Sequence, residues 1–122
     1  MTRLQTVVEL PEFLRRAKAI MTDEDRAALV DFMAANPEAG IALGGGLRKL
    51  RFARPGGGKS GGYRVLAAID PRRTIYVFGG TRIPLFLVTV FAKNEKDNLS
   101  KTEQADLVAL SKALIEHYGE AP

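Results

Sequence analysis

Two stretches near the start of the chain place apolar residues at every third or fourth position, which is the spacing of one helix face. The first, residues 11–21, begins with Pro11, and proline is favoured at the first position of a helix. The second begins after Thr22, which starts a capping-box pattern, and it ends before Pro37. A weakly alternating segment, residues 4–10, precedes both. The pattern therefore predicts a strand followed by two helices.

The spacing of apolar residues changes to a period of two in the second half, which is typical of strands. Residues 47–54 and 62–70 are predicted as strands, and residues 74–78 as a further short strand. In the first of these strands the period of two places Lys49 and Arg51 on one face. Residues 83–93 are apolar on both faces, which predicts a central strand buried from both sides. The glycine-rich residues 37–46 are predicted to form a loop.

Helical spacing returns at the end of the chain. Ser100 and Glu103 form a capping-box pattern, and Gly119 is the predicted end of this third helix. The order is strand, helix, helix, three or four strands, helix. It predicts an α+β fold with a mostly antiparallel sheet, in a single domain that spans residues 1–122.

The composition of the 122 residues narrows the class of protein. The chain contains no cysteine, which excludes a disulfide, a thiolate metal site and a cysteine nucleophile. Its longest apolar run, residues 83–92, is far shorter than a membrane span. We therefore expect a cytoplasmic protein with no membrane partner.

The net charge of +4 conceals an uneven distribution. Residues 40–96 contain eleven basic and two acidic residues, a local net charge of +9, whereas the rest of the chain carries −5. Like charges concentrated in one part of a small fold attract polyanions. The middle of the chain is therefore predicted to form a nucleic-acid surface, with a solvated basic face without a partner as the alternative.

The segment GGGKS, residues 56–60, is similar to the second half of a nucleotide-binding phosphate loop. Such a loop opens directly into a helix, but here two glycines and the strand-forming sequence YRVLAAI follow Ser60. Ala53 also replaces the first glycine of the motif. We therefore predict a flexible, positively charged connection between two strands.

With this order of elements, the chain resembles the RelE/HigB-like toxins of type II toxin–antitoxin systems. The segments that carry the resemblance are residues 47–65 (LRKLRFARPGGGKSGGYRV), residues 84–103 (PLFLVTVFAKNEKDNLSKTE) and the helix that follows. The first half of the chain resembles these toxins only in its pattern of predicted elements. The resemblance implies a compact RelE-like antiparallel sheet with two N-terminal helices and one C-terminal helix.

The resemblance also implies an activity and partners. The activity is endonucleolytic cleavage of messenger RNA, usually in the ribosomal decoding site, which inhibits translation and needs no metal ion or cofactor. The expected partners are the message, the ribosome and a neutralising antitoxin, often with a helix-turn-helix DNA-binding domain.

The chemistry of this cleavage suits basic side chains. RNA is cut when its own 2′-hydroxyl attacks the adjacent phosphorus, so the protein must align the phosphate, move two protons and stabilise developing charge. The resemblance implies five candidate catalytic residues, which are Lys49, Arg51, Arg64, Lys93 and Glu95. Arg64 and Arg51 would bind the scissile phosphate, Lys93 or Lys49 would transfer a proton, and Glu95 would be their acid–base partner. Contacts with RNA or the ribosome are expected from Arg48, Arg54, Lys59 and Lys96.

Each assignment has an alternative. Lys49 and Arg51 could form an exposed strand face, Arg64 could belong to a structural ion pair, and Glu95 could pair with neighbouring lysines. The single histidine, His117, is predicted to be a surface residue. At the level of function, the alternatives are a ParE-like poison of DNA gyrase and a non-catalytic nucleic-acid-binding module. The group of basic residues favours the nuclease over both.

Overall fold

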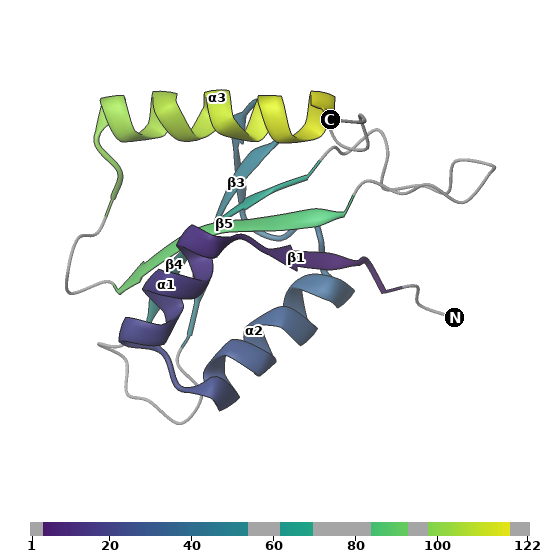
Figure 1. The fold of residues 1–122 in the computed structure, drawn as a ribbon, viewed down its shortest axis with the longest axis vertical. Coiled ribbons are helices and arrows are strands. Elements are labelled where there is room, and N and C mark those ends of the chain that lie inside the picture. Colours follow the sequence, from purple (N-terminus) through teal and green to yellow (C-terminus); the bar gives the residue numbers. More distant parts are fainter. Residues whose placement is uncertain (1–3, 54–61, 70–83, 93–97, 118–122) are drawn as a thin grey trace.

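The computed structural model describes residues 4–53, 62–69, 84–92 and 98–117. Within these ranges the chain forms three helices and one five-stranded sheet (Figure 1). In chain order the elements are β1 (Val7–Glu9), α1 (Pro11–Ile20), α2 (Asp23–Ala35), β2 (Ile41–Gly44), β3 (Leu47–Phe52), β4 (Tyr63–Ala68), β5 (Leu85–Ala92) and α3 (Lys101–His117). This order confirms the predicted α+β fold.

The strand order in the sheet is β1-β5-β4-β3-β2. The pairs β2–β3, β3–β4 and β4–β5 are antiparallel, which confirms the predicted succession of β3, β4 and β5. As predicted, β5 lies inside the sheet, between β1 and β4. The first strand, β1, is parallel to β5, so the sheet is mixed. Alternation of apolar residues specifies neither the partner nor the direction of a strand, and the parallel pair was therefore not predicted.

The prediction of a loop for residues 37–46 is wrong in part, because β2 forms within it and pairs with β3. The strand lies at the edge of the sheet and is mostly exposed, so its sequence lacks the buried alternation that marks a strand. Pairing with β3 outweighs its low strand propensity. The predicted strand at residues 74–78 and the predicted helix end at Gly119 lie outside the described residues.

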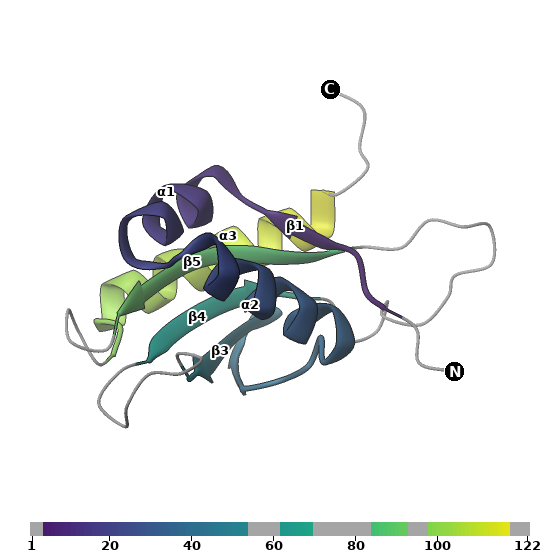
Figure 2. The same ribbon diagram turned by 90° about the horizontal axis from the view of Figure 1, so that it is seen from below.

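The helices cover both faces of the sheet, with α1 and α2 on one face and α3 on the other (Figures 1 and 2). Phe13 and Leu29, from α1 and α2, join a core with Val65 of β4. On the opposite face, Leu66 of β4 packs with Ile115 of α3. Every residue of β4 is buried, because the strand lies between these two cores.

The predicted helix starts are confirmed. Pro11 occupies the first turn of α1, and the Thr22 side chain accepts a hydrogen bond from the Asp25 backbone N–H at 3.0 Å. The capping box of α3 is reciprocal. The Ser100 N–H donates to Glu103 Oε1 at 3.0 Å, and the Glu103 N–H donates to Ser100 Oγ at 3.1 Å. These bonds satisfy amides that have no partner within a helix.

The turn between β2 and β3 holds α3 against the sheet. The Ser111 hydroxyl, fully buried, donates to the Gly45 carbonyl at 2.9 Å. Gly46 adopts φ +84°, and a Cβ atom there would lie 2.3 Å from Ile115 Cδ1 and 2.8 Å from the Ile69 carbonyl oxygen. Glycine is therefore required at this position both for its conformation and for the close approach of α3.

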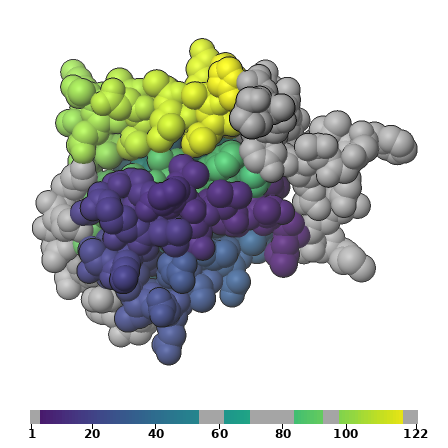
Figure 3. Space-filling view, viewed as in Figure 1, coloured from purple at the N-terminus to yellow at the C-terminus, as the bar shows by residue number. Residues whose placement is uncertain are grey.

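A strip of β5 remains visible between α3 and the N-terminal elements in the space-filling view (Figure 3). None of the helices in the described ranges is long and apolar enough to cross a membrane.

Candidate functional site

Three of the predicted site residues lie on the face of the sheet that α3 covers. Leu47 and Leu66 belong to the core under α3, and side chains two positions apart on a strand share a face. Lys49 and Arg51 therefore lie on this face of β3, as predicted, and Arg64 lies on the same face of β4. We call Lys49, Arg51 and Arg64 the basic cluster.

The strand register places Arg51 directly opposite Arg64. Like charges at directly opposite positions of neighbouring strands destabilise a sheet. A bound anion such as a phosphate would offset this repulsion, because guanidinium groups bind phosphate through charge-assisted hydrogen bonds. Sequence periodicity predicted the shared face of Lys49 and Arg51, but the position of Arg64 depends on the register.

The members of the basic cluster differ in exposure. Arg51 is exposed and Lys49 is half-buried, whereas Arg64 is only 4% exposed. The guanidinium of Arg64 lies close to Gly62, since its Nη1 is 3.9 Å from the position that a Cβ atom on Gly62 would occupy. Solvent therefore reaches Arg51 more readily than Arg64.

Lys49 has a hydrogen-bond partner that sequence reasoning missed. Its Nζ donates to Asn98 Oδ1 at 3.0 Å, across 49 positions of sequence. The same oxygen accepts the Leu99 backbone N–H at 3.1 Å. Asn98 lies within residues 84–103, which carry the resemblance, but no role was predicted for it.

Arg48 lies apart from the basic cluster, because neighbouring residues of a strand point to opposite faces. Its Nη2 donates to the Gly40 carbonyl at 2.8 Å, and its Nε donates to the Ala39 carbonyl at 3.4 Å. This arginine therefore supports the segment that leads into β2.

The other predicted residues, Arg54, Lys59, Lys93, Glu95 and Lys96, lie outside the described residues. The strand ends that adjoin these segments are described and come together at one end of the sheet. Phe52 at the end of β3 pairs with Tyr63 at the start of β4, and Tyr63 pairs with Ala92 at the end of β5. The basic cluster lies at this end of the sheet, since Arg51 and Arg64 are each one position further into their strands.

A second contact that sequence reasoning missed fixes the start of β4. The Tyr63 hydroxyl lies 3.0 Å from Asp25 Oδ2 and 3.2 Å from the Ile20 carbonyl oxygen, and it shares its single proton between these two acceptors. Tyr63 and Asp25 are both buried. The contact ties the residue before Arg64 to the first turn of α2.

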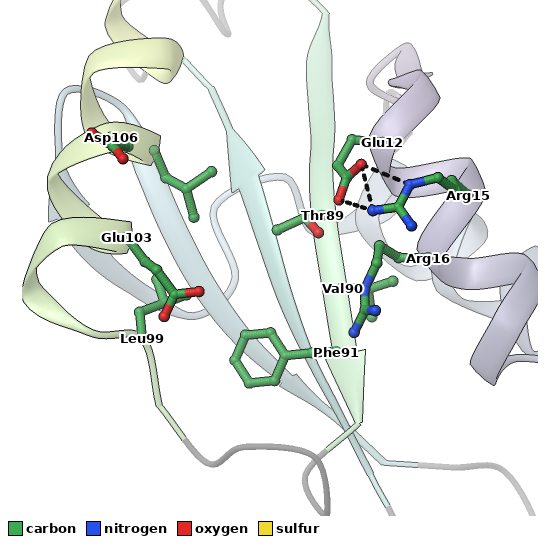
Figure 4. Close-up of a pocket in the computed structure, with 10 residues that line it drawn as sticks. Glu12, Arg15, Arg16, Thr89, Val90, Phe91, Leu99, Glu103 and Asp106 are labelled. Carbon is green, nitrogen blue, oxygen red and sulfur yellow. Dashed lines mark hydrogen bonds and ion pairs between the residues drawn. The ribbon is translucent and has the colours of Figure 1, made fainter.

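A cleft of about 520 Å³ lies beside the basic cluster, between α1 and α3 (Figure 4). Thr89 and Phe91 of β5 lie between the two helices, and Phe91 is the register partner of Arg64. The charged residues that line the cleft are Glu12, Arg15, Arg16, Glu103 and Asp106. Arg15 is bound to Glu12 through contacts of 2.7 to 3.0 Å. With three carboxylates against two guanidinium groups, this cleft suits a polyanion less well than the basic cluster does.

Within the described ranges, no group of three or more His, Asp or Glu side chains is arranged to hold a metal ion. The basic cluster itself consists of cations, which can bind a phosphate and stabilise negative charge that develops on it.

A comparison with protein-family models gives a match over residues 10–121 to the RelE toxin of the RelE/RelB toxin–antitoxin system. The match spans all the helices, β2 to β5 and every residue of the basic cluster. It also agrees with the resemblance carried by residues 47–65 and 84–103. The chain belongs to the RelE toxin family.

Proposed function

We propose that this toxin is an endoribonuclease that cleaves messenger RNA and thereby inhibits translation, with the ribosome presenting the message. Membership of the RelE toxin family supports the role of toxin and implies a cognate antitoxin as partner. The antitoxin is proposed to carry a helix-turn-helix DNA-binding domain.

The observation that carries the proposal is the cross-strand pair Arg51–Arg64 with Lys49 on the same face. Two opposed arginines beside a lysine concentrate positive charge on one face of the sheet, and such a charge attracts a phosphate. An RNA backbone supplies phosphates at regular intervals, and a scissile phosphate held between two guanidinium groups is fixed in orientation as well as position.

The proposed reaction uses a nucleophile that the substrate carries. The 2′-oxygen attacks the adjacent phosphorus as its proton leaves to a base, the P–O5′ bond breaks, and the 5′-oxygen receives a proton. The products are a 2′,3′-cyclic phosphate and a 5′-hydroxyl. Arg64 and Arg51 would hold the phosphate, Lys49 or Lys93 would take part in proton transfer, and Glu95 would act as acid–base partner.

The burial of Arg64 supports different roles for the two arginines. An exposed guanidinium can meet an approaching phosphate, so Arg51 would make the first contact. Arg64, only 4% exposed, is held in place by the packing of β4 and would contact the phosphate once it is bound. Rigid donors stabilise transition-state charge well, because they need no reorganisation during the reaction. Arg54, Lys59 and Lys96 are proposed to contact RNA or the ribosome outside the reacting phosphate, whereas Arg48 is proposed to support the segment before β2.

The test is to induce the protein in growing cells and to map the 5′ ends of message fragments. The wild-type protein should stop growth, lower translation and create new 5′ ends inside coding regions. Arg64→Ala should relieve the arrest, because loss of one such contact slows the reaction roughly a hundredfold. Arg15→Ala is the matched control, since this exposed arginine is paired with Glu12 on α1.

Two results would contradict the proposal. If Arg64→Ala remains fully toxic at equal protein levels, with an unchanged melting temperature, the site is assigned wrongly. If growth stops with intact messages and with DNA breaks that depend on gyrase, the protein acts as a ParE-like poison instead.

A further inference from the structure

Asn98 connects the basic cluster to the segment that leads into α3. Its Oδ1 accepts hydrogen bonds from the Lys49 ammonium at 3.0 Å and from the Leu99 N–H at 3.1 Å. The bond to the Leu99 amide fixes the orientation of the Asn98 side chain. Two positions later the segment is anchored in turn by the reciprocal capping box of Ser100 and Glu103. The oxygen that accepts the hydrogen bond from Lys49 is therefore held in place independently of the lysine.

We propose that Asn98 is a positioning residue for the reaction, which holds the ammonium group of Lys49 over the sheet in the place where the scissile phosphate binds. This inference rests on the proposed ribonuclease function and goes beyond it, because neither the family match nor the sequence pattern assigns a role to Asn98.

The position of Lys49 makes such help necessary. A lysine ammonium is carried on four flexible methylene groups, and immobilising it costs conformational entropy. Arg51, the exposed member of the cluster, lies two positions along the same strand, so its Cα atom is roughly 7 Å from that of Lys49. Without an acceptor, repulsion from Arg51 and Arg64 would direct the ammonium away from the cluster. The hydrogen bond to Asn98 instead keeps it on the same face of the sheet as both arginines.

The identity of the acceptor also matters. A carboxylate at position 98 would hold the ammonium equally well, but its negative charge would repel an RNA phosphate that binds beside it. The neutral amide of Asn98 accepts the same hydrogen bond without this repulsion. An asparagine can therefore hold the Lys49 ammonium in place and leave its positive charge available to attract a polyanion.

The test is a double-mutant cycle with Lys49→Ala, Asn98→Ala and the combination of both. Single-turnover cleavage of a defined message is measured at saturating protein, both with free message and with message on ribosomes, together with the half-saturating concentration. Asn98→Ala should lower the cleavage rate about tenfold, the loss expected for a hydrogen bond to a charged group. The half-saturating concentration should change less than twofold, because Arg51 and Arg64 still bind the phosphate.

The cycle separates positioning from a general structural effect. In the Lys49→Ala background, Asn98→Ala should have no further effect on the rate, since the lysine that it positions is gone. Asn98→Asp should restore most of the rate but raise the half-saturating concentration. Asn36→Ala is the matched control, because this exposed asparagine makes a local hydrogen bond at the end of α2, far from the cluster in sequence.

Equal rate losses from Asn98→Ala in the wild-type and Lys49→Ala backgrounds would overturn the inference, as would a loss matched by Asn36→Ala. A wild-type protein that cuts neither form of the message would overturn the proposed function itself, and the positioning role with it.

Discussion

The hydroxyl of Tyr63 lies 3.0 Å from Oδ2 of Asp25, and this buried contact joins the first residue of β4 to the first turn of α2. The two residues are 38 positions apart in the sequence. Because Arg64 follows Tyr63, the contact also holds in place the end of β4 that carries Arg64.

We predict that Tyr63→Phe lowers the free energy of unfolding by about 1–3 kcal/mol, because it leaves the buried Asp25 carboxylate without this donor. Urea denaturation would measure the loss. Asp23→Asn, at the exposed carboxylate two positions before Asp25, is the control and should change stability by less than about 0.5 kcal/mol. An unchanged unfolding midpoint for Tyr63→Phe would show that the contact contributes nothing to stability.

Gly46 and Gly44 provide a matched pair for the contact between α3 and the sheet. Both have positive φ, at +84° and +105°, so alanine is strained at either position by about 1–2 kcal/mol. Only at Gly46 would the added Cβ atom meet Ile115 and the backbone of Ile69, whereas the space at Gly44 is open. We therefore predict that Gly46→Ala costs at least about 1–3 kcal/mol more than Gly44→Ala, as an overpacked core does. Equal costs would mean that α3 moves aside without penalty.

Arg48 and Arg51 lie on opposite faces of β3, so variants of these two residues test the two faces separately. Arg51→Ala should abolish most of the toxicity with little loss of stability, because Arg51 is exposed. Arg48→Ala should lower stability by about 1–2 kcal/mol, because two backbone carbonyls lose their donor. Thermal melting and growth after induction measure the two effects. If Arg48→Ala keeps full stability but loses as much toxicity as Arg51→Ala does, Arg48 contacts RNA, as was expected from its charge.

The glycine-rich connection offers a test of binding as distinct from chemistry. Arg54 and Lys59 lie outside the described residues, and their proposed role is to contact phosphates of the message or the ribosome. Replacing both with alanine should flatten the salt dependence of association, by about 0.7–0.9 in the log–log slope for each lost contact. The single-turnover rate in the saturated complex should stay the same, because uniform binding does not change the barrier. Loss of that rate would instead place one of the two side chains at the reacting phosphate.

Local signals in the sequence were sufficient for much of the fold. The starts of α1, α2 and α3 follow from Pro11, Thr22 and Ser100, whose contacts lie within one helical turn. The strands β3 to β5 follow from their period of two or their continuous apolar character. The edge strand β2 was missed because its residues are mostly exposed and its pairing with β3 is its main support.

The site was harder to predict because it depends on contacts between distant residues. Periodicity placed Lys49 and Arg51 on one face, but the opposition of Arg51 and Arg64 needs the register of β3 and β4. Asn98 meets Lys49 across 49 positions, and Tyr63 meets Asp25 across 38. Neither distance leaves a repeating pattern in the sequence. The burial of Arg64 likewise results from packing on both faces of β4, which no single segment encodes.

The parallel pair of β1 and β5 has a consequence for synthesis of the protein. Val8 is paired with Phe86, 78 positions later, so β1 has no strand partner while most of the chain is still being made. At typical rates of translation this delay lasts roughly 4–16 s. A nascent chain that is still short of β5 also lacks the neighbour that β4 needs on its second side. The chain must therefore be synthesised as far as β5 before the five-stranded sheet can be completed.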